Sequence, residues 1–270
     1  WDFFREIEKL GGMRAALKAE WPQSQIQTVA ASRGSDHAVR RSGLVGTNLF
    51  PNLQDKLPVT SDNAPAAATA GLDTVDARNW PDCLSAAMAA IRDGVAVTEA
   101  ILAPAQTAAM TIFAPLVPYR AAAPFEALRH RAQKVQADRG RPPVAMMLKM
   151  GPVKQHKPRA DFSIEFVSVG GFAPLAKEIF ETASDATMAA IESDADVGVI
   201  CSTDDTYPEL VPEIARAIKA AKPKMQIVLA GLPREEALVQ SFRDAGVDEF
   251  IHVRANIPEV LGRLLTAVEA

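Results

Sequence analysis

The chain has 270 residues, 48% hydrophobic and 23% charged, a composition typical of a globular protein with one or two domains. Its formal net charge of −4 argues against a surface for nucleic acid or an anionic membrane. Cys83 and Cys201 lie far apart and fit no zinc or redox spacing, and no apolar run is long enough to span a bilayer. These features predict a reduced, cytoplasmic protein without nucleic-acid or membrane partners.

Residues 1–50 predict helices followed by one strand. The stretch "WDFFREIEKLGGMRAALKAEW" has apolar residues at helical spacing, with Gly11 and Gly12 as a break between two helices. A further helix is expected across "QSQIQTVAASRGSDHAVRRSG", and "GLVGTNLFP" has the pattern of a buried strand. Such a set is too small for a complete α/β domain. We therefore expect part of a larger domain, and a chain that is the C-terminal part of a longer polypeptide.

Residues 51–118 are rich in proline and alanine, which favours an extended linker. Within them, "PDCLSAAMAAIRDGVAVTEAILA" predicts a helix pair around a central glycine. Residues 119–140 predict a connecting helix, with Pro124 in its first turn and Gly140 just past its end.

Residues 141–270 alternate between short apolar runs and amphipathic helices. The expected strands are "VAMMLKM", "APLAKEI", "DVGVICS", "MQIVLAG" and "EFIHV". The helices between and after them are expected at 157–170, 184–194, 207–221, 234–246 and 257–270. Five such units without a dinucleotide-binding glycine pattern predict a flavodoxin-like parallel sheet of order 2-1-3-4-5, with any ligand at the carboxyl ends of the strands.

The stretch "KMGPVKQHKPRADF", residues 149–162, falls at that edge and contains His156. A lone histidine after a strand is more often a solvated loop residue or helix-start residue than a metal ligand. Cys201 is expected to be a small buried hydrophobic residue. The adjacent acids Asp204 and Asp205 are expected to cap the following helix. A magnesium or phosphoacceptor pocket would need a further acid after the first strand, where the chain has lysines instead.

Six segments resemble the methylmalonyl-CoA mutase family, and within it the small subunits of bacterial heterodimers. They occur in the family's order and are "WDFFREIEKLGGMRAAL", "RSGLVGTNLFPN", "PFEALRHRAQ", "LKMGPVKQHKPRADF", "GGFAPLAKEIFETASDATMAAIESDADVGVICSTDDTYPELVP" and "AGVDEFIHVRANIPEVL". The resemblance implies that residues 1–50 are the end of a (β/α)₈ (TIM) barrel. It also implies that residues 141–270 have the fold of a cobalamin-binding domain.

Catalytic members of the family carry Asp-x-His-x-x-Gly after the first strand of that domain. The resemblance implies that the histidine ligates cobalt, the aspartate accepts its other ring N–H, and the glycine leaves room for the cofactor's nucleotide tail. The matching residues are Lys154, His156 and Arg159. A lysine only donates hydrogen bonds, and an arginine side chain fills space that the tail needs.

Two further signatures of the family differ in this chain. Ser-x-Leu after the third strand is replaced by Cys201-Ser202-Thr203, and Gly-Gly after the fourth by Ala230-Gly231. The resemblance therefore predicts a structural subunit that has no catalytic residue and binds neither cobalamin nor a metal. Its partner would be a large catalytic subunit that holds adenosylcobalamin and interconverts methylmalonyl-CoA and succinyl-CoA.

Two alternatives stay open from the sequence. In the first, His156 still ligates cobalt, although loss of its acceptor typically lowers affinity about 10–100-fold. In the second, the chain is a flavodoxin-like regulatory or sensing module, which has local support only from Asp204 and Asp205.

Overall fold

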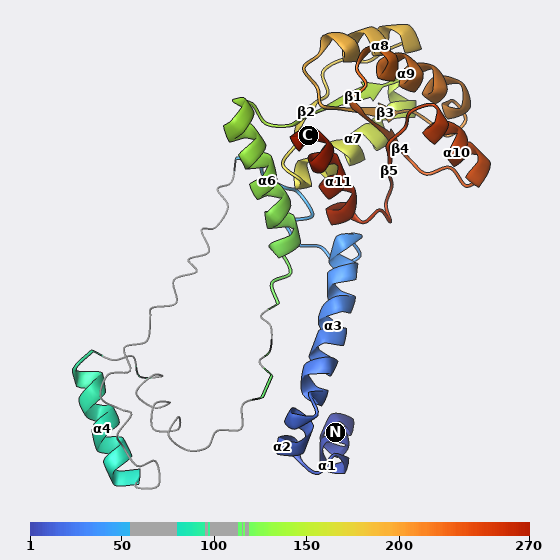
Figure 1. The fold of residues 1–270 in the computed structure, drawn as a ribbon. Helices are drawn as coiled ribbons and strands as arrows, with labels where there is room; N and C mark the ends of the chain where they lie inside the picture. Colours follow the sequence, from blue (N-terminus) through green and yellow to red (C-terminus); the bar gives the residue numbers. More distant parts are fainter. Residues whose placement is uncertain (55–79, 95–96, 98–112, 115, 117–118) are drawn as a thin grey trace. The chain divides into compact units, whose positions relative to one another are not determined.

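The computed structural model describes residues 1–54, 80–94, 97, 113–114, 116 and 119–270 (Figure 1). The chain divides into two compact units. The first comprises Trp1–Ile26 and Pro58–Val117, and the second comprises Gln27–Leu57 and Pro118–Ala270. Most of the expected linker and the second helix of the expected pair lie outside the described residues. The domain boundaries derived from the sequence stay predictions.

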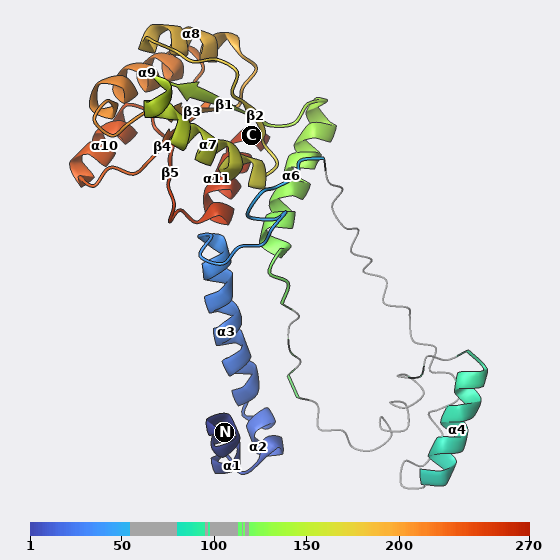
Figure 2. The same ribbon diagram turned by 180° about the vertical axis from the view of Figure 1, so that it is seen from behind.

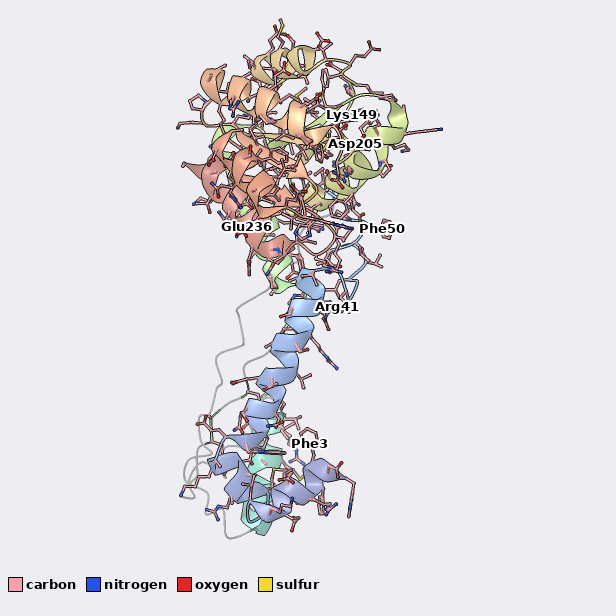
Figure 3. All side chains as sticks on the ribbon, turned by 90° about the vertical axis from the view of Figure 1, so that its right-hand side faces the viewer. Phe3, Arg41, Phe50, Lys149, Asp205 and Glu236 are labelled. Carbon is pink, nitrogen blue, oxygen red and sulfur yellow. The ribbon has the colours of Figure 1, made fainter. Side chains whose placement is uncertain are left out.

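The first unit is helical in its described part. α1 (Asp2–Lys9) and α2 (Met13–Lys18) are separated by Gly11 and Gly12, whose φ angles of +93° and +88° favour glycine. α3 (Trp21–Ala38) starts in this unit, and α4 (Trp80–Arg92) is the first helix of the expected pair. No residue of α1 is buried, and Figure 3 labels its exposed Phe3.

The expected strand at residues 43–51 is wrong. The segment instead forms a turn closed by an isolated bridge between Val45 and Leu49, and Val45 is 81% exposed. The buried Asn48 holds this turn through its side-chain amide, which binds the N–H of Leu44 and the carbonyl oxygens of His37 and Ser42. The run of apolar residues looked like a strand because the pattern does not reveal an amide that organises the backbone locally.

Within the second unit, Arg40 links the end of α3 to a later helix. Its guanidinium carbon lies 5.5 Å from the ring centroid of Phe162 and 5.7 Å from that of Phe166. Burial lowers the pKa of Arg40, and the nearby carboxylate of Glu165 acts in the opposite direction. The other oxygen of Glu165 accepts the backbone N–H of Phe50 at 3.0 Å. These contacts tie the segment after α3 to the helix that carries the two phenylalanines.

The second unit contains a parallel sheet in the order β2-β1-β3-β4-β5, as the sequence predicts. Its strands are β1 (Val144–Lys149), β2 (Ala173–Leu175), β3 (Val197–Cys201), β4 (Gln226–Ala230) and β5 (Glu249–Ile251). All four pairings are parallel. β2 lies at one edge, where its central residue, Pro174, has no N–H to offer another strand.

Helices cover both faces of this sheet (Figure 2). One face packs against α6 (Ala123–Arg139), α7 (Val153–Val169) and α11 (Ile257–Glu269). The other packs against α8 (Ala183–Glu192), α9 (Tyr207–Ala221) and α10 (Glu236–Asp244). The predicted helices are confirmed with small shifts of their ends, except that α7 begins four residues before its expected start. None of the described helices is long and apolar enough to cross a membrane.

At the amino ends of the strands, two aspartates that directly precede strands accept backbone N–H groups. Asp196 accepts the N–H of Val144 at 2.9 Å and pairs with Arg141 at 2.8 Å. Asp248 accepts the N–H of Ile227 at 2.7 Å. In both cases an acid placed before one strand satisfies the free N–H near the start of a neighbouring strand.

Candidate functional site

The topological switch point lies between β1 and β3, because the chain leaves β1 toward β2 on one side and later returns to place β3 on the other. Two connections meet at this carboxyl-end edge, one after β1 and one after β3. Figure 3 marks the edge by Lys149, the last residue of β1, and Asp205, in the connection after β3. Most of the predicted site residues come from these connections and from the end of β4.

His156 is a buried residue in the first turn of α7. It is 3% exposed, so the expected helix-start position is confirmed but the expected exposure to solvent is wrong. Its Nδ1 lies 2.9 Å from the carbonyl oxygen of Gly151. A carbonyl oxygen only accepts, so we assign the proton to Nδ1 and the free lone pair to Nε2. The backbone thus orients the ring, in place of a side chain at position 154.

The lysines of this region do not replace the missing acceptor. Lys154 is exposed on the first turn of α7. The ammonium group of Lys149 donates to the carbonyl oxygen of Ala176, just past the end of β2, at 2.6 Å. The side chain of Gln155 lies against Gly151, where an added Cβ would be 2.5 Å from its Oε1. The side chains of Lys149 and Gln155 thus occupy the carboxyl end of β1, and neither is a carboxylate that could accept the imidazole N–H.

Arg159 extends from α7 to the ends of β3 and β4. Its Nη1 donates to the carbonyl oxygen of Ala230, the last residue of β4, at 2.8 Å, and its Nη2 donates to Asp204 at 2.8 Å. Its guanidinium carbon lies 5.0 Å from the ring centroid of Tyr207. Burial lowers the pKa of Arg159, but Tyr207 and Asp204 together outweigh this effect and raise it above its usual value. The side chain therefore stays charged in a crevice between two strand ends.

Tyr207 is the residue of this site that sequence reasoning missed. It is buried at the start of α9, where its hydroxyl donates to the carbonyl oxygen of Ala230 at 2.7 Å and accepts the N–H of Ser202 at 3.1 Å. Burial raises the pKa of its phenol to about 12. A signal was present, since a tyrosine at the start of a helix that follows a strand must find partners for its hydroxyl when buried.

The connection after β3 holds the other predicted residues. Cys201 is fully buried, and burial raises the pKa of its thiol to about 12, which confirms it as a packing residue. Ser202 is also buried and receives a hydrogen bond from Thr206 at 2.8 Å. The sequence predicts that Asp204 and Asp205 cap α9, and this prediction is wrong. The residue at the cap position is Thr206.

Ala230 and Gly231 form the floor of the crevice. Gly231 has a φ of +143°, and an added Cβ would lie 2.6 Å from Nη1 of Arg159 and 3.3 Å from its guanidinium carbon. The backbone angle favours glycine at this position, and the missing Cβ leaves the space that the arginine occupies.

Four exposed apolar side chains surround this edge, in the segments that follow β1, β2, β4 and β5. They are Val153, Ile179, Leu232 and Val253. Exposed apolar residues that gather at one edge are typical of a surface that contacts another protein.

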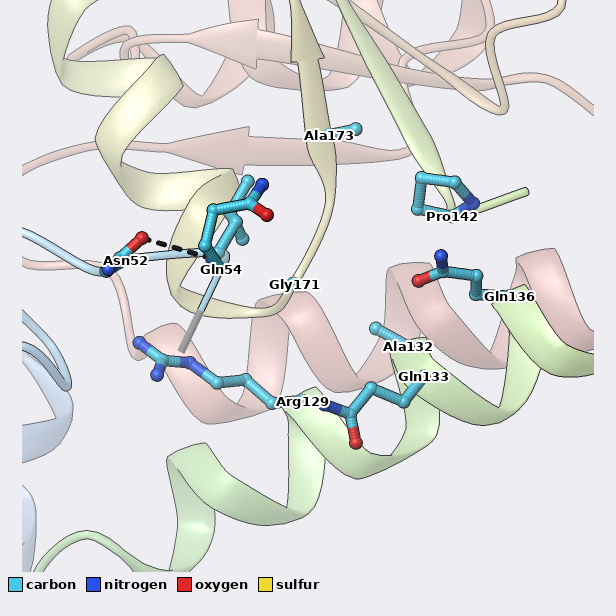
Figure 4. Close-up of a pocket in the computed structure, with 10 residues that line it drawn as sticks. Asn52, Gln54, Arg129, Ala132, Gln133, Gln136, Pro142, Gly171 and Ala173 are labelled. Carbon is cyan, nitrogen blue, oxygen red and sulfur yellow. Dashed lines mark hydrogen bonds between the residues drawn. The ribbon is translucent and has the colours of Figure 1, made fainter. Parts of the chain in front are cut away.

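A cavity of about 240 Å³ lies away from this edge, between α6, residues 52–54 and the loop before β2 (Figure 4). Its lining is rich in amide side chains, and Arg129 beside it donates to the carbonyl oxygens of Gly46 and Thr47. Within the part of the chain that the structure describes, no three His, Cys, Asp or Glu side chains are grouped so that they could hold a metal ion.

Comparison with known proteins gives one family. The family model described as methylmalonyl-CoA mutase matches residues 1–114. The chain is 27% identical over 261 residues to the methylmalonyl-CoA mutase small subunit of Porphyromonas gingivalis. The matched region covers 97% of this chain and 35% of that protein. It is 29% identical over 248 residues to the small subunit of Streptomyces virginiae, covering 92% and 33%.

A third relative is the probable methylmalonyl-CoA mutase small subunit of Mycobacterium bovis, 27% identical over 271 residues, covering 100% of this chain and 34% of that protein. The chain spans about a third of the length of these curated relatives. The resemblance to this family, and to its small subunits, is therefore confirmed.

Proposed function

We propose that this chain, similar to small subunits of methylmalonyl-CoA mutase over nearly its whole length, is part of such a subunit in the cytoplasm and supports a large catalytic partner. The partner would hold adenosylcobalamin and interconvert methylmalonyl-CoA and succinyl-CoA. This chain would have no catalytic residue and would bind no cobalamin. Two kinds of support exist, namely the relatives' names and the groups that occupy the carboxyl-end edge of the sheet.

The single observation that carries the proposal is the position of Arg159. Its guanidinium lies between the ends of β3 and β4, bound to Ala230 and Asp204, at the residue that matches the glycine of the catalytic members. The resemblance assigns that space to the cofactor's nucleotide tail. The residues present do not fit the cofactor, because its tail and this side chain require the same volume.

His156 adds a second, weaker reason. Its ring has an acceptor in the Gly151 carbonyl, so the lack of an aspartate at Lys154 does not by itself remove the support that a ligating histidine needs. The ring is nevertheless 3% exposed within the first turn of α7. Little of the imidazole ring is therefore open to a ligand from solution.

The test is a cobalamin absorbance titration of the chain, beside a purified large subunit from the same organism as the binding control. We expect no stoichiometric uptake by this chain, and His156→Ala should leave its spectrum unchanged. Stoichiometric uptake with a spectrum that depends on His156 would overturn the proposal and favour the alternative in which this histidine ligates cobalt.

The proposed contact with a large subunit is tested by co-purification. The exposed apolar residues after the strands support a protein-facing edge, so Leu232→Asp and Val253→Asp together should weaken recovery of the large subunit. Met188→Asp is the matched control, because Met188 is an equally exposed apolar residue on α8, away from these connections. If the control and the double variant retain the partner equally, this edge is not the contact.

The sensing module has less support. The acid that it would use, Asp204, is already paired with Arg159 at 2.8 Å. No group of three acids or other ligand side chains accompanies it among the described residues.

A further inference from the structure

The crevice at the ends of β3 and β4 offers a guanidinium group four complementary features. They are the carbonyl oxygen of Ala230, the carboxylate of Asp204, the ring face of Tyr207 and the missing Cβ of Gly231. Planar guanidinium groups bind acceptors through a fork of N–H groups and stack on aromatic faces, which an ammonium group does less well.

Three of these features are fixed by the fold itself. Tyr207 is 1% exposed, and its hydroxyl joins Ser202 at the end of β3 to Ala230 at the end of β4. The Ala230 oxygen has two lone pairs, and Tyr207 and Arg159 each occupy one. Gly231 lies so close to the guanidinium that any Cβ there would collide with it. The site is therefore built on rigid strand ends.

An ordinary surface ion pair does not explain this arrangement. The Asp204 side chain is 75% exposed, and exposed pairs contribute little. The same helix α7 carries such a pair, Lys157 with Asp161 at 2.8 Å, and both of these side chains are more than half exposed. Arg159 differs from Lys157 because its main contacts are to a backbone carbonyl and an aromatic ring inside the crevice.

From this geometry we infer that Asp204, Tyr207, Ala230 and Gly231 form a guanidinium-binding site whose resident ligand is Arg159. The arginine acts as an internal plug that ties α7 to the carboxyl ends of β3 and β4. The inference deepens the proposed function, since a domain that holds no cofactor needs another group to complete this edge. The site requires no other protein and no external ligand.

The experiment empties the site and offers it a free ligand. Thermal unfolding midpoints of the wild-type chain and of Arg159→Ala are measured with methylguanidinium chloride at low millimolar concentrations, far below those that denature. We expect Arg159→Ala to lower the midpoint by roughly 3–6 °C. Methylguanidinium should then raise the midpoint of this variant in a saturable way, because a ligand that binds only the folded state stabilises it.

Four controls define the specificity. Methylammonium chloride at the same concentrations should not restore the midpoint, and neither salt should stabilise the wild type. Lys157→Ala should lower the midpoint little and show no rescue. In Arg159→Ala with Gly231→Ala, the added Cβ should block the ligand and abolish the rescue.

The inference is overturned if methylguanidinium and methylammonium act equally on Arg159→Ala, or if neither acts. If Arg159→Ala does not fold, Arg159→Lys provides the test. A wild-type midpoint in that variant would show that a positive charge suffices and overturn the site, whereas a clear loss supports it. Uptake of cobalamin by the wild type would instead refute the proposed function, so the two failures are distinguishable.

Discussion

At the two ends of the strands in the parallel sheet, free backbone groups are paired with side chains of opposite charge. At the amino end, the carboxylates of Asp196 and Asp248 accept N–H groups near the starts of β1 and β4. At the carboxyl end, the cations of Lys149 and Arg159 donate to carbonyl oxygens at or just past the ends of β2 and β4. A parallel sheet leaves free donors at one edge and free acceptors at the other, and each edge receives the matching charge.

The edges differ in where these charged groups come from. Each aspartate directly precedes a strand, so its position follows from the chain itself. Arg159 reaches the end of β4 from α7, a helix far from it in sequence. The amino end is thus completed by residues that directly precede strands, whereas the carboxyl end, where open α/β sheets hold their ligands, also receives a side chain from a helix.

The largest effect is expected at the amino end. Asp196→Ala would leave the Val144 N–H without an acceptor and break the pair with Arg141, which should lower the free energy of unfolding by about 3 kcal/mol. Urea denaturation measures this change. The neighbouring exposed Asp194→Ala is the control and should stay within about 0.5 kcal/mol of the wild type. An equal effect of both variants would mean that Asp196 does not complete this edge.

A smaller effect is expected from Tyr207→Phe at the carboxyl end. Removal of the hydroxyl takes a partner from Ser202 and from Ala230, and should lower the free energy of unfolding by about 1–2 kcal/mol at pH 7.

The advantage of the wild type over Tyr207→Phe should depend on pH. The folded-state pKa of Tyr207 is raised from 10.0 to about 12, so its contribution is fully present below pH 10 and is lost as the pH rises through 12. The loss by pH 12 should be about 2 kcal/mol, which removes the advantage of the wild type. A difference between the two proteins that stays constant from pH 9 to 12 would contradict the burial of this phenol.

The smallest effect is expected from Asp204→Asn. Its carboxylate is mostly exposed, so loss of the ion pair with Arg159 should change the free energy of unfolding by less than about 0.5 kcal/mol. The remaining difference should vanish in 1 M salt, where screening is strong. A change as large as that from Tyr207→Phe would show that the carboxylate, and not the carbonyl and the ring, dominates the binding of Arg159.

Much of the second unit could be predicted from the sequence. Five short apolar runs separated by amphipathic helices specify a parallel sheet covered on both faces, and the structure has it in the predicted order. The position of His156 was less predictable. Pro158 favours a helix that starts just before it, whereas α7 begins at Val153 and accommodates the proline within the helix. His156 is therefore the buried residue of a mostly exposed first turn.

The partners of Arg159 could not be read from spacing. Asp204 lies 45 positions away and Ala230 lies 71 positions away, and only the winding of the sheet brings them together. The segment 43–51 was mispredicted for a different reason, since the local contacts of the buried Asn48 amide and not strand pairing decide its shape. Contacts between distant side chains need the fold before they can be predicted.

Gly231 has a consequence for how related sequences are interpreted. A glycine after the fourth strand would ordinarily be taken as a mark of cofactor binding. In this chain the backbone angle of Gly231 and the nearby guanidinium of Arg159 both favour glycine, so the residue has a structural reason that is independent of any cofactor. The informative feature is the pair, because an arginine at position 159 together with a glycine at position 231 indicates a closed crevice, whereas the glycine alone indicates neither state.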